Sequence, residues 1–512
     1  MSISLIRSKA AVTALAAAVS VTGLLPAAAS AHEGPGRTSG TTYYVDCLRG
    51  SDQASGPNSG TAWRTLTKAS RAYEPGDRLL LRRGRTCTGV LAPTGSGTAA
   101  EPISIDAYGK GAKPHIEGGG ARAAVYLFNV EGWELRNLDI SNAGAHTTTD
   151  RRAGLLVRLT DHGVGSHYVV DGVDVHDVNG ADFKDPDPSG GILFSVTGSA
   201  VPTRFDGVRI EDSTVRRTVR TVRTGIGTSS SWGRRVEHPN GPGTSWEAIT
   251  GLRIQRNKVY DVGGDGIVVQ TAKGALVEHN YVNGFNMRSA GYNAGIWGWN
   301  SDDALYQYNE VTGGHGTLDS MAYDIDGGNN RNVYQYNYSH DNEGGFLLIC
   351  NGAGMTTDGN RVRHNISIND RNTMSPYGVI SVVRAATTDT RIYGNTIVTD
   401  EANTALVSDN GPTGVTFRNN IFVGASGGSP INDTRSVYEN NLYWRTAQPL
   451  DTTALTADPL FASASPTAPR DVRLRAGSPA LGTGIPVADG ITRDYFGNRI
   501  PTPPNLGADQ DR

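Results

Sequence analysis

Short apolar segments with a two-residue period recur along most of this chain, separated by turns rich in Gly, Asn and Asp. This period is typical of β-strands that bury one face. From about residue 120 the pattern repeats, and its most regular mark is an Asn just after a short strand, at Asn257, Asn280, Asn309, Asn337, Asn365, Asn395 and Asn419. The spacings are 23, 29, 28, 28, 30 and 24 residues. Repeats of about 20–50 residues indicate a solenoid, a propeller or an array.

Each repeat contains three short strands. The third strands lie at residues 266–270, 295–299, 322–326, 345–349 and 378–382. The repeats do not show the 3.6-residue period of helices, which counts against ankyrin, tetratricopeptide and HEAT repeats. They also do not contain the regularly spaced leucines of a leucine-rich repeat. The pattern therefore predicts an all-β fold, a parallel β-helix with three strands per coil.

The recurring Asn has a physical explanation in such a fold. Coils of a β-helix stack about 4.8 Å apart, so equivalent side chains lie directly above one another. An inward Asn can donate its amide to the Asn of the next coil, and it can also hold a tight turn in the left-handed conformation. The series predicts an internal Asn ladder; the alternative is that each Asn is an isolated turn residue.

The N-terminal segment has the features of a targeting signal. Arg7 and Lys9 precede an apolar run at 10–25, and Ala-Ser-Ala at 29–31 is typical of a cleavage site. We expect a signal peptide at 1–31, a leader and N-terminal cap at 32–118, the β-helix at 119–445, and a C-terminal segment capping the helix at 446–512. Within the cap, the pattern predicts strands at 43–46, 77–81 and 103–108 and a helix at 62–72.

Secretion changes the expected chemistry of the cysteines. Cys47 and Cys87 both lie in the cap segment, and an oxidising compartment lets them form a disulfide. Cys350 follows an apolar run and is predicted to be a buried thiol. No later run of about 20 apolar residues occurs, so we expect an extracellular protein with no membrane partner.

The high Gly content agrees with a fold that contains many turns, and the net charge counts against a nucleic-acid partner. Gly contributes 65 of the 512 residues, nearly twice the usual share of about 7%. The formal net charge of −3 counts against a nucleic-acid partner held through phosphate contacts. We expect a monomer.

Both ends of the mature chain resemble a known family. Tyr-Tyr-Val-Asp at 43–46, Trp-Arg-Thr-Leu at 63–66 and Pro-Gly-Asp at 75–77 are similar to the N-terminal cap of the secreted right-handed parallel β-helix proteins of the pectate-lyase-like superfamily. Asp-Pro-Leu-Phe at 458–461, Gly-Ser-Pro-Ala at 477–480 and Asn-Leu-Gly-Ala at 505–508 are similar to their C-terminal segment. The resemblance implies a carbohydrate-active protein. Because the superfamily includes polysaccharide lyases, glycoside hydrolases and non-catalytic binding proteins, the activity must be argued from the site.

Polar and aromatic side chains gather on one phase of three consecutive third strands. The apolar phase should face the interior and contains Ile267, Val269, Ile296, Tyr323, Ile325, Phe346, Leu348 and Val379. The opposite phase should face solvent and contains Gln270, Trp297, Trp299, Asp324 and Asp326, followed on the next coil by Leu347 and Ile349. Pyranose rings stack on aromatic planes, so we expect the two tryptophans, with Gln270 and Asn300, to bind substrate. The alternative is that a loop such as 285–292 covers the tryptophans.

Three acids near this surface suit a two-carboxylate hydrolase. Asp324 and Asp326 are two residues apart on one strand, with Cα atoms roughly 6.6 Å apart, and Glu343 comes just before the next third strand. One carboxyl group can protonate the leaving oxygen while another acts as nucleophile or base. We predict Asp324, Asp326 and Glu343 as the catalytic residues of a glycoside hydrolase. The alternatives are a solvated turn for Glu343 and a ligand or metal site for the two aspartates.

A polysaccharide lyase is the second interpretation. The resemblance implies a Lys or Arg base, and Lys184 and Arg223 lie on earlier coils. No cofactor is predicted, although Ca²⁺ could bind the acids beside Lys184, namely Asp182, Asp185 and Asp187. No lysine occurs after Lys273, so a lyase acting beside the tryptophans would need Arg363 or Arg384 as its base.

A non-catalytic carbohydrate-binding protein is the third interpretation. Such a protein has no need of three acids beside an aromatic surface. The His residues lack zinc-site spacing, and no G-x-S-x-G motif occurs. In every interpretation the expected partner is a polysaccharide or an oligosaccharide.

Overall fold

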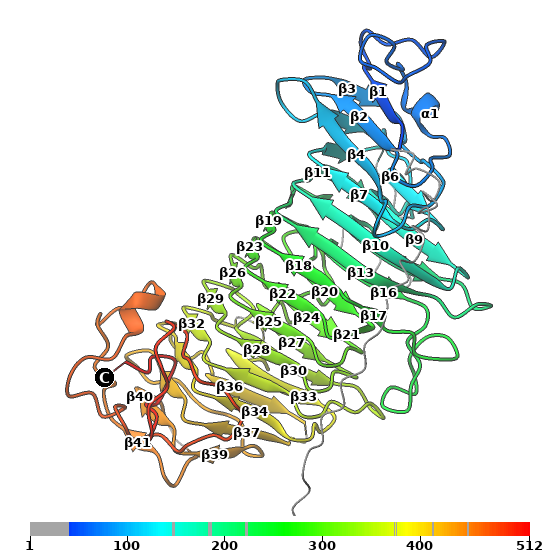
Figure 1. The fold of residues 1–512 in the computed structure, drawn as a ribbon. Helices are drawn as coiled ribbons and strands as arrows, with labels where there is room; N and C mark the ends of the chain where they lie inside the picture. The colour runs from blue at the N-terminus through cyan, green and yellow to red at the C-terminus, as the bar shows by residue number, and fades with distance from the viewer. Residues whose placement is uncertain are drawn as a thin grey trace, which may run out of the picture. The chain divides into compact units, whose positions relative to one another are not determined.

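Three parallel sheets run along the stack of coils (Figure 1). The computed structural model describes residues 40–511 except 146–148, 183–186, 221–223, 373, 375, 412–413 and 448–449. The predicted signal peptide therefore lies outside the described residues. Within the part of the chain that is described, no helix is long and apolar enough to cross a membrane.

Each strand pairs in parallel with its counterparts one coil before and one coil after, which confirms the predicted parallel β-helix with three strands per coil. The 16-stranded sheet contains β1 (Thr42–Val45), β2 (Arg78–Arg82), β4 (Ile103–Tyr108), β7 (Trp133–Arg136), β10 (Val164–Asp171), β13 (Arg204–Glu211), β17 (Ile249–Thr250), β18 (Arg253–Gln255), β21 (Ala272–Lys273), β22 (Leu276–Glu278), β25 (Leu305–Gln307), β28 (Val333–Gln335), β31 (Arg361–Arg363), β34 (Thr390–Tyr393), β37 (Val415–Arg418) and β39 (Val437–Glu439).

The other two sheets complete each coil. The 15-stranded sheet contains β3 (Thr86–Thr88), β5 (His115–Glu117), β8 (Asp139–Asn142), β11 (Asp174–Gly180), β14 (Thr214–Arg216), β15 (Val219–Arg220), β19 (Lys258–Tyr260), β23 (Tyr281–Asn283), β26 (Glu310–Thr312), β29 (Tyr338–His340), β32 (Ile366–Ile368), β35 (Thr396–Val398), β38 (Ile421–Val423), β40 (Leu442–Trp444) and β41 (Leu455–Thr456). The 10-stranded sheet contains β6 (Ala123–Phe128), β9 (Ala153–Thr160), β12 (Gly190–Thr197), β16 (Thr224–Ser230), β20 (Asp265–Gln270), β24 (Ile296–Trp299), β27 (Tyr323–Asp326), β30 (Leu347–Asn351), β33 (Ile380–Arg384) and β36 (Val407–Asn410).

The predicted Asn ladder runs through the interior of the stack. From Asn280 onward, each ladder Asn accepts, through Oδ1, the main-chain N–H and the side-chain amide of the Asn one coil before, at 2.9–3.0 Å. Asn257, the first member, accepts the main-chain N–H of Ser213 at 3.1 Å. The members are Asn257, Asn280, Asn309, Asn337, Asn365, Asn395, Asn420 and Asn441. Every buried amide in the ladder therefore has partners, as a low-dielectric interior requires.

Two details of the ladder prediction were wrong. The member after Asn395 is Asn420 rather than Asn419, because the ladder residue is always the third after an inward strand residue, here Phe417. The left-handed turn conformation belongs to the residue just before the ladder Asn, for example Tyr308 (φ 53°). The ladder and the turn are thus two neighbouring positions with separate roles.

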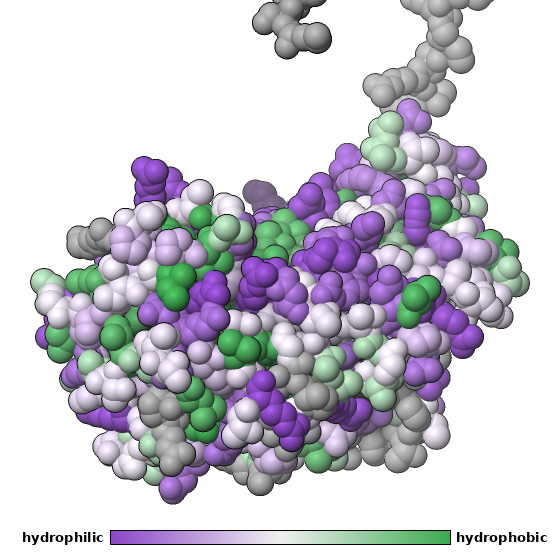
Figure 2. Space-filling view, turned by 90° about the horizontal axis from the view of Figure 1, so that it is seen from below, coloured by the Kyte–Doolittle hydropathy of each residue, from purple (hydrophilic) through white to green (hydrophobic). Residues whose placement is uncertain are grey.

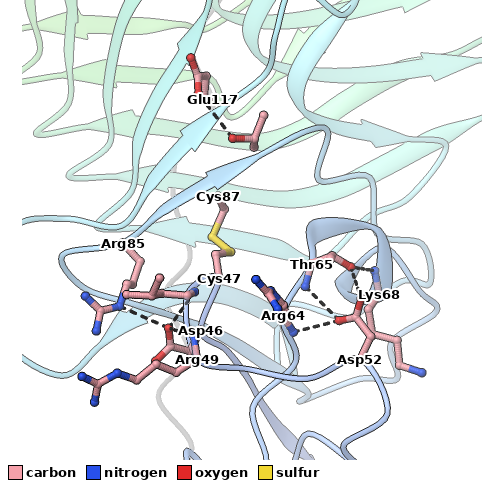
Figure 3. The surroundings of a disulfide bond; sticks show 12 residues. Asp46, Cys47, Arg49, Asp52, Arg64, Thr65, Lys68, Arg85, Cys87 and Glu117 are labelled. Atoms are coloured by element: carbon pink, nitrogen blue, oxygen red, sulfur yellow. Dashed lines mark hydrogen bonds and ion pairs between the residues drawn. A yellow bond between two sulfur atoms is a disulfide. The ribbon is translucent and has the colours of Figure 1, made fainter.

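The N-terminal cap confirms three predicted strands and one covalent bond. β1, β2 and β4 occupy the predicted ranges to within a residue or two and already pair in the 16-stranded sheet. Cys47 and Cys87 form the predicted disulfide, with Cα atoms 5.3 Å apart (Figure 3). Asp46, next to Cys47, pairs with Arg85 at 3.3 Å on the β3 side of that bond (Figure 3).

The helix predicted at 62–72 is reduced to one turn, α1 (Leu66–Ala69). Trp63 and Ala72, on either side of this turn, form isolated parallel bridges with Val45 and Thr94. Strand pairing with the rest of the cap therefore overrides the local helical spacing. The short helix keeps an N-cap, since the Thr65 hydroxyl accepts the N–H of Lys68 at 3.1 Å.

The C-terminal segment packs on the outer face of the 15-stranded sheet. A second apolar cluster joins Ile366, Val398 and Leu442 of this sheet to Phe461 and Leu506 of the segment. The segment also includes a short 3₁₀ helix, Pro469–Val472. Seen from below Figure 1, hydrophilic and hydrophobic residues alternate over the exposed surface (Figure 2).

Candidate active site

A cavity of about 210 Å³ opens on the outer face of the 10-stranded sheet. Three carboxylates line it, from Asp319, Asp324 and Asp326. The remaining wall is mainly aromatic and apolar, with one cation, and includes Tyr292, Trp297, Leu348, Cys350, Tyr377 and Arg384. A concave site with acids beside aromatic rings suits a sugar ligand better than an apolar one.

Two of the three carboxylates that line the cavity come from strand β27 and face outward. Tyr323 and Ile325 of this strand are buried in the core, and Asp324 and Asp326 alternate with them. In register, Asp324 lies opposite Trp297 of β24 on one side and Leu348 of β30 on the other. The sequence prediction that these two acids share the outer face with Trp297 is consistent with this placement.

Asp319 is the acid that the sequence analysis missed. It lies in the loop between β26 and β27 and is 8% exposed. Its Oδ1 accepts the main-chain N–H groups of Asn293 at 3.1 Å and Ser320 at 2.6 Å. A loop position has no strand alternation, so the pattern offered no signal that this carboxylate faces the cavity.

The phase predicted for strand β30 was wrong by one residue. Leu347 and Ile349 pair with Tyr323 and Ile325 and face the core, so Leu348 faces out. The cause is a local irregularity at the start of the strand, where the N–H groups of Phe346 and Leu347 both donate to the Val379 carbonyl, at 2.7 and 3.1 Å.

Cys350 shares this outward phase, opposite Asp326. It is a half-buried free thiol in the cavity wall, where the sequence analysis expected a buried one. Burial raises the pKa of the Cys350 thiol, and the nearby charges of Asp326 and Asp324 raise it further. The thiol is therefore neutral at physiological pH and unsuited to act as a nucleophile.

Trp297 separates the main cavity from a smaller hollow. Its side chain is 5% exposed, and Nε1 donates to Asp265 Oδ1 at 3.0 Å. Gln270, predicted to bind substrate, is buried and lines the smaller hollow with Trp297 and Asp265. Trp297 therefore borders both the cavity and the smaller hollow, and its hydrogen bond to Asp265 holds the ring in place.

Trp299 and Asn300 lie under a loop at residues 231–247. The ring of His238 packs edge-on against Trp299, with centroids 4.7 Å apart. Asn300 is fully buried and donates through Nδ2 to the Gly233 carbonyl at 2.6 Å. Burial also lowers the pKa of His238 to about 4, so the covering ring is neutral. The placement of Asn300 fits loop attachment and gives no support to its predicted contact with substrate.

Glu343 contacts the loop between β26 and β27. Its Oε2 accepts the Gly316 N–H at 2.9 Å and pairs with His315 Nδ1 at 2.8 Å. It is not among the residues that line the cavity. The cavity wall therefore joins Asp324 and Asp326 to Asp319, and the predicted role of Glu343 stays a prediction.

The second predicted cluster falls partly on residues that are not described. Lys184, Asp185 and Arg223 lie outside the described residues. Of their neighbours, Asp182 accepts the Ser289 hydroxyl at 2.7 Å, and Asp187 is paired with both Arg122 and Arg158. Two guanidinium partners satisfy Asp187 and compete with any Ca²⁺ at its carboxylate.

The two alternative arginine bases occupy different places. Arg384 lines the cavity at the end of β33. Arg363 lies on the 16-stranded sheet, where it pairs with Asp489 of the C-terminal segment at 2.5 Å and donates to Gln335. Of the two, only Arg384 is placed to meet a ligand in this cavity.

The fold matches a described family. The family model for the right-handed β-helix region matches residues 190–380. The fold is a right-handed parallel β-helix. The complex structure of XylC with xylose shares this fold, with a TM-score of 0.51 over 91% of this chain and 98% of that one, at 11% identity.

Two more similar proteins are named for an activity. The GH136 lacto-N-biosidase of Eubacterium ramulus is 27% identical, with a TM-score of 0.64 over 79% of this chain and 67% of that chain. The lacto-N-biosidase of Bifidobacterium longum subsp. longum is 28% identical over 594 aligned residues, which cover 92% of this chain. This chain spans about a third, 36%, of the length of that curated relative.

Proposed function

We propose that this chain is a secreted glycoside hydrolase that cleaves an oligosaccharide or a polysaccharide in the cavity on the 10-stranded sheet. One observation carries the proposal: Asp319, Asp324 and Asp326 line the same cavity as an aromatic wall. Glycoside hydrolysis needs two carboxyl groups, one as acid and one as nucleophile or base. The similarity to two lacto-N-biosidases supports the same class of reaction.

The environments of the three aspartates suggest different roles. Asp319 accepts two main-chain N–H groups, which favours the ionised form, so we assign it as nucleophile or base. Asp326 accepts only one main-chain N–H among the described hydrogen bonds, from Gly327 at 2.7 Å, and as the more exposed of the β27 pair it can reach the leaving oxygen, so we assign it as the acid. Asp324 is 7% exposed and lies between Trp297 and Leu348, where it can bind a sugar hydroxyl.

The substrate proposal follows the relatives. We propose a lacto-N-bioside as the first substrate to test, because both similar enzymes are named for that activity. Tyr292 and Tyr377 stand at the cavity wall and offer ring faces and hydroxyls to a disaccharide. A panel of other aryl glycosides and of polysaccharides tests whether the specificity is broader.

Three conservative variants test the roles. Asp319→Asn, Asp324→Asn and Asp326→Asn keep shape and remove charge, and loss of a catalytic carboxylate should lower kcat roughly 10²-fold or more. We expect this loss for Asp319→Asn and Asp326→Asn, measured with an aryl lacto-N-bioside, and mainly a higher KM for Asp324→Asn. In a retaining enzyme, azide added to the acid variant should give a glycosyl azide of retained anomeric configuration, and azide added to the nucleophile variant should give one of inverted configuration, which separates Asp326 from Asp319.

The matched control is Asp303→Asn, an exposed aspartate paired with Arg331 on another face. Its kcat should equal that of the unmodified protein. Glu343→Gln decides between the two site predictions. A loss as large as that of the aspartate variants would restore the sequence-based assignment of Glu343. Full activity in all three aspartate variants would overturn the assignment of this cavity as the active site.

The lyase alternative retains one supporting observation, the presence of Arg384 in the cavity wall. Elimination from a uronate produces an unsaturated product that absorbs ultraviolet light, whereas hydrolysis produces reducing ends alone. Both signals together, abolished by Arg384→Ala, would transfer the proposal to a lyase. Binding of a glycan with neither signal would instead favour a non-catalytic protein.

A further inference from the structure

We propose that His115, Asp139 and His176 form a binding site for a divalent transition metal, with Zn²⁺ as the best match. His115 and Asp139 begin strands β5 and β8, His176 is the third residue of β11 on the next coil, and all three lie on the outer face of the 15-stranded sheet. One ligand atom from each lies within 4.8 Å of the others. The site is separate from the cavity that carries the proposed activity, and it does not depend on that activity.

The carboxylate of Asp139 faces both imidazoles. Its Oδ1 is 3.0 Å from Nε2 of His176, and its Oδ2 is 3.5 Å from Nδ1 of His115. Two atoms bound to one tetrahedral zinc at about 2.1 Å are about 3.4 Å apart. The separations therefore suit ligands of one ion, and two nitrogens with one carboxylate oxygen is a donor set that Zn²⁺ accepts.

The two ring nitrogens of His176 have different neighbours, and the one that faces Asp139, Nε2, is where a cation can bind. Nδ1 of His176 lies 2.7 Å from Oδ2 of Asp177, and a carboxylate only accepts, so the ring proton must stay on Nδ1. The lone pair of Nε2 then faces Asp139, in the direction of a metal ion shared with that carboxylate. A carboxylate behind a ligating histidine is the usual support of a zinc ligand.

One ring nitrogen of His115 likewise has a hydrogen-bond partner, and the other faces Asp139. Its Nε2 lies 2.8 Å from the hydroxyl of Ser141, which can accept the ring proton and leave Nδ1 free to bind a metal. Two neighbouring cations have other partners, since Lys113 pairs with Asp174 at 2.8 Å and Arg217 pairs with Asp177 at 2.9 Å. A third, Arg216 of β14, lies opposite His176 in register, and its charge also acts on Asp139. Among the described residues, the ion pairs of Asp139 are with the two histidines alone.

A metal here would join three coils close to the disulfide. β5 pairs with β3, which carries Cys87, and Glu117 at the far end of β5 lies near the disulfide in Figure 3. Because the ligands come from different coils, an ion that binds only the folded chain stabilises their stacking by mass action. The half-buried ligands leave a side open to solvent, where water can complete the coordination.

The test uses the mature chain without a histidine tag, stripped with a chelator. Zn²⁺ should bind in a one-to-one ratio by titration calorimetry and raise the melting temperature. Co²⁺ should give the visible absorption bands of a four-coordinate nitrogen–oxygen site. His115→Gln, Asp139→Asn and His176→Gln should each weaken Zn²⁺ binding by at least tenfold, and Asp177→Asn by about tenfold through its effect on His176.

The matched control is His167→Gln, which removes a similar surface histidine paired with Glu134 at 3.0 Å on the neighbouring sheet. It should bind Zn²⁺ like the unmodified chain. The Co²⁺ spectrum of the unmodified protein needs no variant, so the proposal remains testable if a ligand variant fails to fold. Absence of stoichiometric Zn²⁺ and Co²⁺ binding would overturn it and leave a protonated histidine as the cation at this site. Binding unchanged in all three ligand variants would overturn it equally.

Discussion

At the scale of single residues, the protein shows how burial changes the chemistry of one acid. Asp370 is fully buried beside the interior ladder, where its Oδ1 accepts the side chain of Asn342 at 2.8 Å and its Oδ2 accepts the hydroxyl of Ser367 at 2.6 Å. Burial raises the pKa of Asp370 from its ordinary 3.8 to about 6, although these hydrogen bonds oppose the shift.

This shift predicts a pH dependence of stability. Between about pH 4 and pH 6 the unfolded chain has lost the proton and the folded chain retains it, so stability falls as pH rises. Two pH units correspond to about 3 kcal/mol. Asp370→Asn, which keeps the oxygen acceptor, should therefore be more stable than the unmodified chain by a margin that is on the order of 2 kcal/mol larger at about pH 8 than at about pH 4. Denaturant unfolding at both pH values measures it, and an equal margin at both would contradict the assignment.

Trp297 illustrates a residue whose role changes once its contacts are known. As a side chain held by Asp265 and facing the cavity with one part of its ring, it should bind substrate without taking part in proton transfer. Trp297→Phe keeps an aromatic wall and loses the hydrogen bond. We expect KM to rise several-fold with kcat nearly unchanged, because such binding acts equally on ground and transition states. A fall in kcat at constant KM would show a direct role in the reaction instead.

At the scale of the structural element, the Asn ladder is the main polar device. Asn337 accepts the main-chain N–H and the side-chain amide of Asn309, and donates to the Tyr306 carbonyl and to Asn365, all at about 3.0 Å. Each of these partners is buried, so none can turn to water if Asn337 is removed.

Asn337→Leu should therefore lower the free energy of unfolding by several kcal/mol, since each buried group left without a partner costs about 1–3 kcal/mol. Asn283→Leu is the control, because Asn283 is exposed at the end of β23, and it should change stability by less than about 0.5 kcal/mol. Both are read from denaturant unfolding curves. Equal effects of the two substitutions would show that the ladder contributes little.

At the scale of the whole molecule, the disulfide closes a segment of 40 residues at the N-terminal end of the stack. The double variant Cys47→Ser/Cys87→Ser should lose about 2–4 kcal/mol of stability in the cap. The proposed activity should be unaffected because the cavity lies on later coils. Thermal unfolding of the variant, with Cys350→Ser as the control thiol substitution, measures the effect. A melting temperature equal to that of the control would contradict it.

The sequence by itself determined the repeating parts of this protein. A β-helix repeats one coil geometry, so a two-residue period identifies the strands, and a buried amide once per coil identifies the ladder. These local signals predicted the three-strand coil and the outward face of β27. The expected secretion and the place of both cysteines in the cap predicted the pairing of Cys47 with Cys87. The same rule, counted from Phe417, would also have found Asn420.

The tertiary structure alone decided what the repeat does not encode. The shared hydrogen-bond acceptor at Val379 shifts the phase of β30, and a loop carries Asp319 into the cavity beside Asp324 and Asp326. Another loop buries Asn300. His115, Asp139 and His176 meet only because their coils stack. Loops and irregular strand starts have no period, and contacts between coils depend on register, so both are set by the packing of the folded chain.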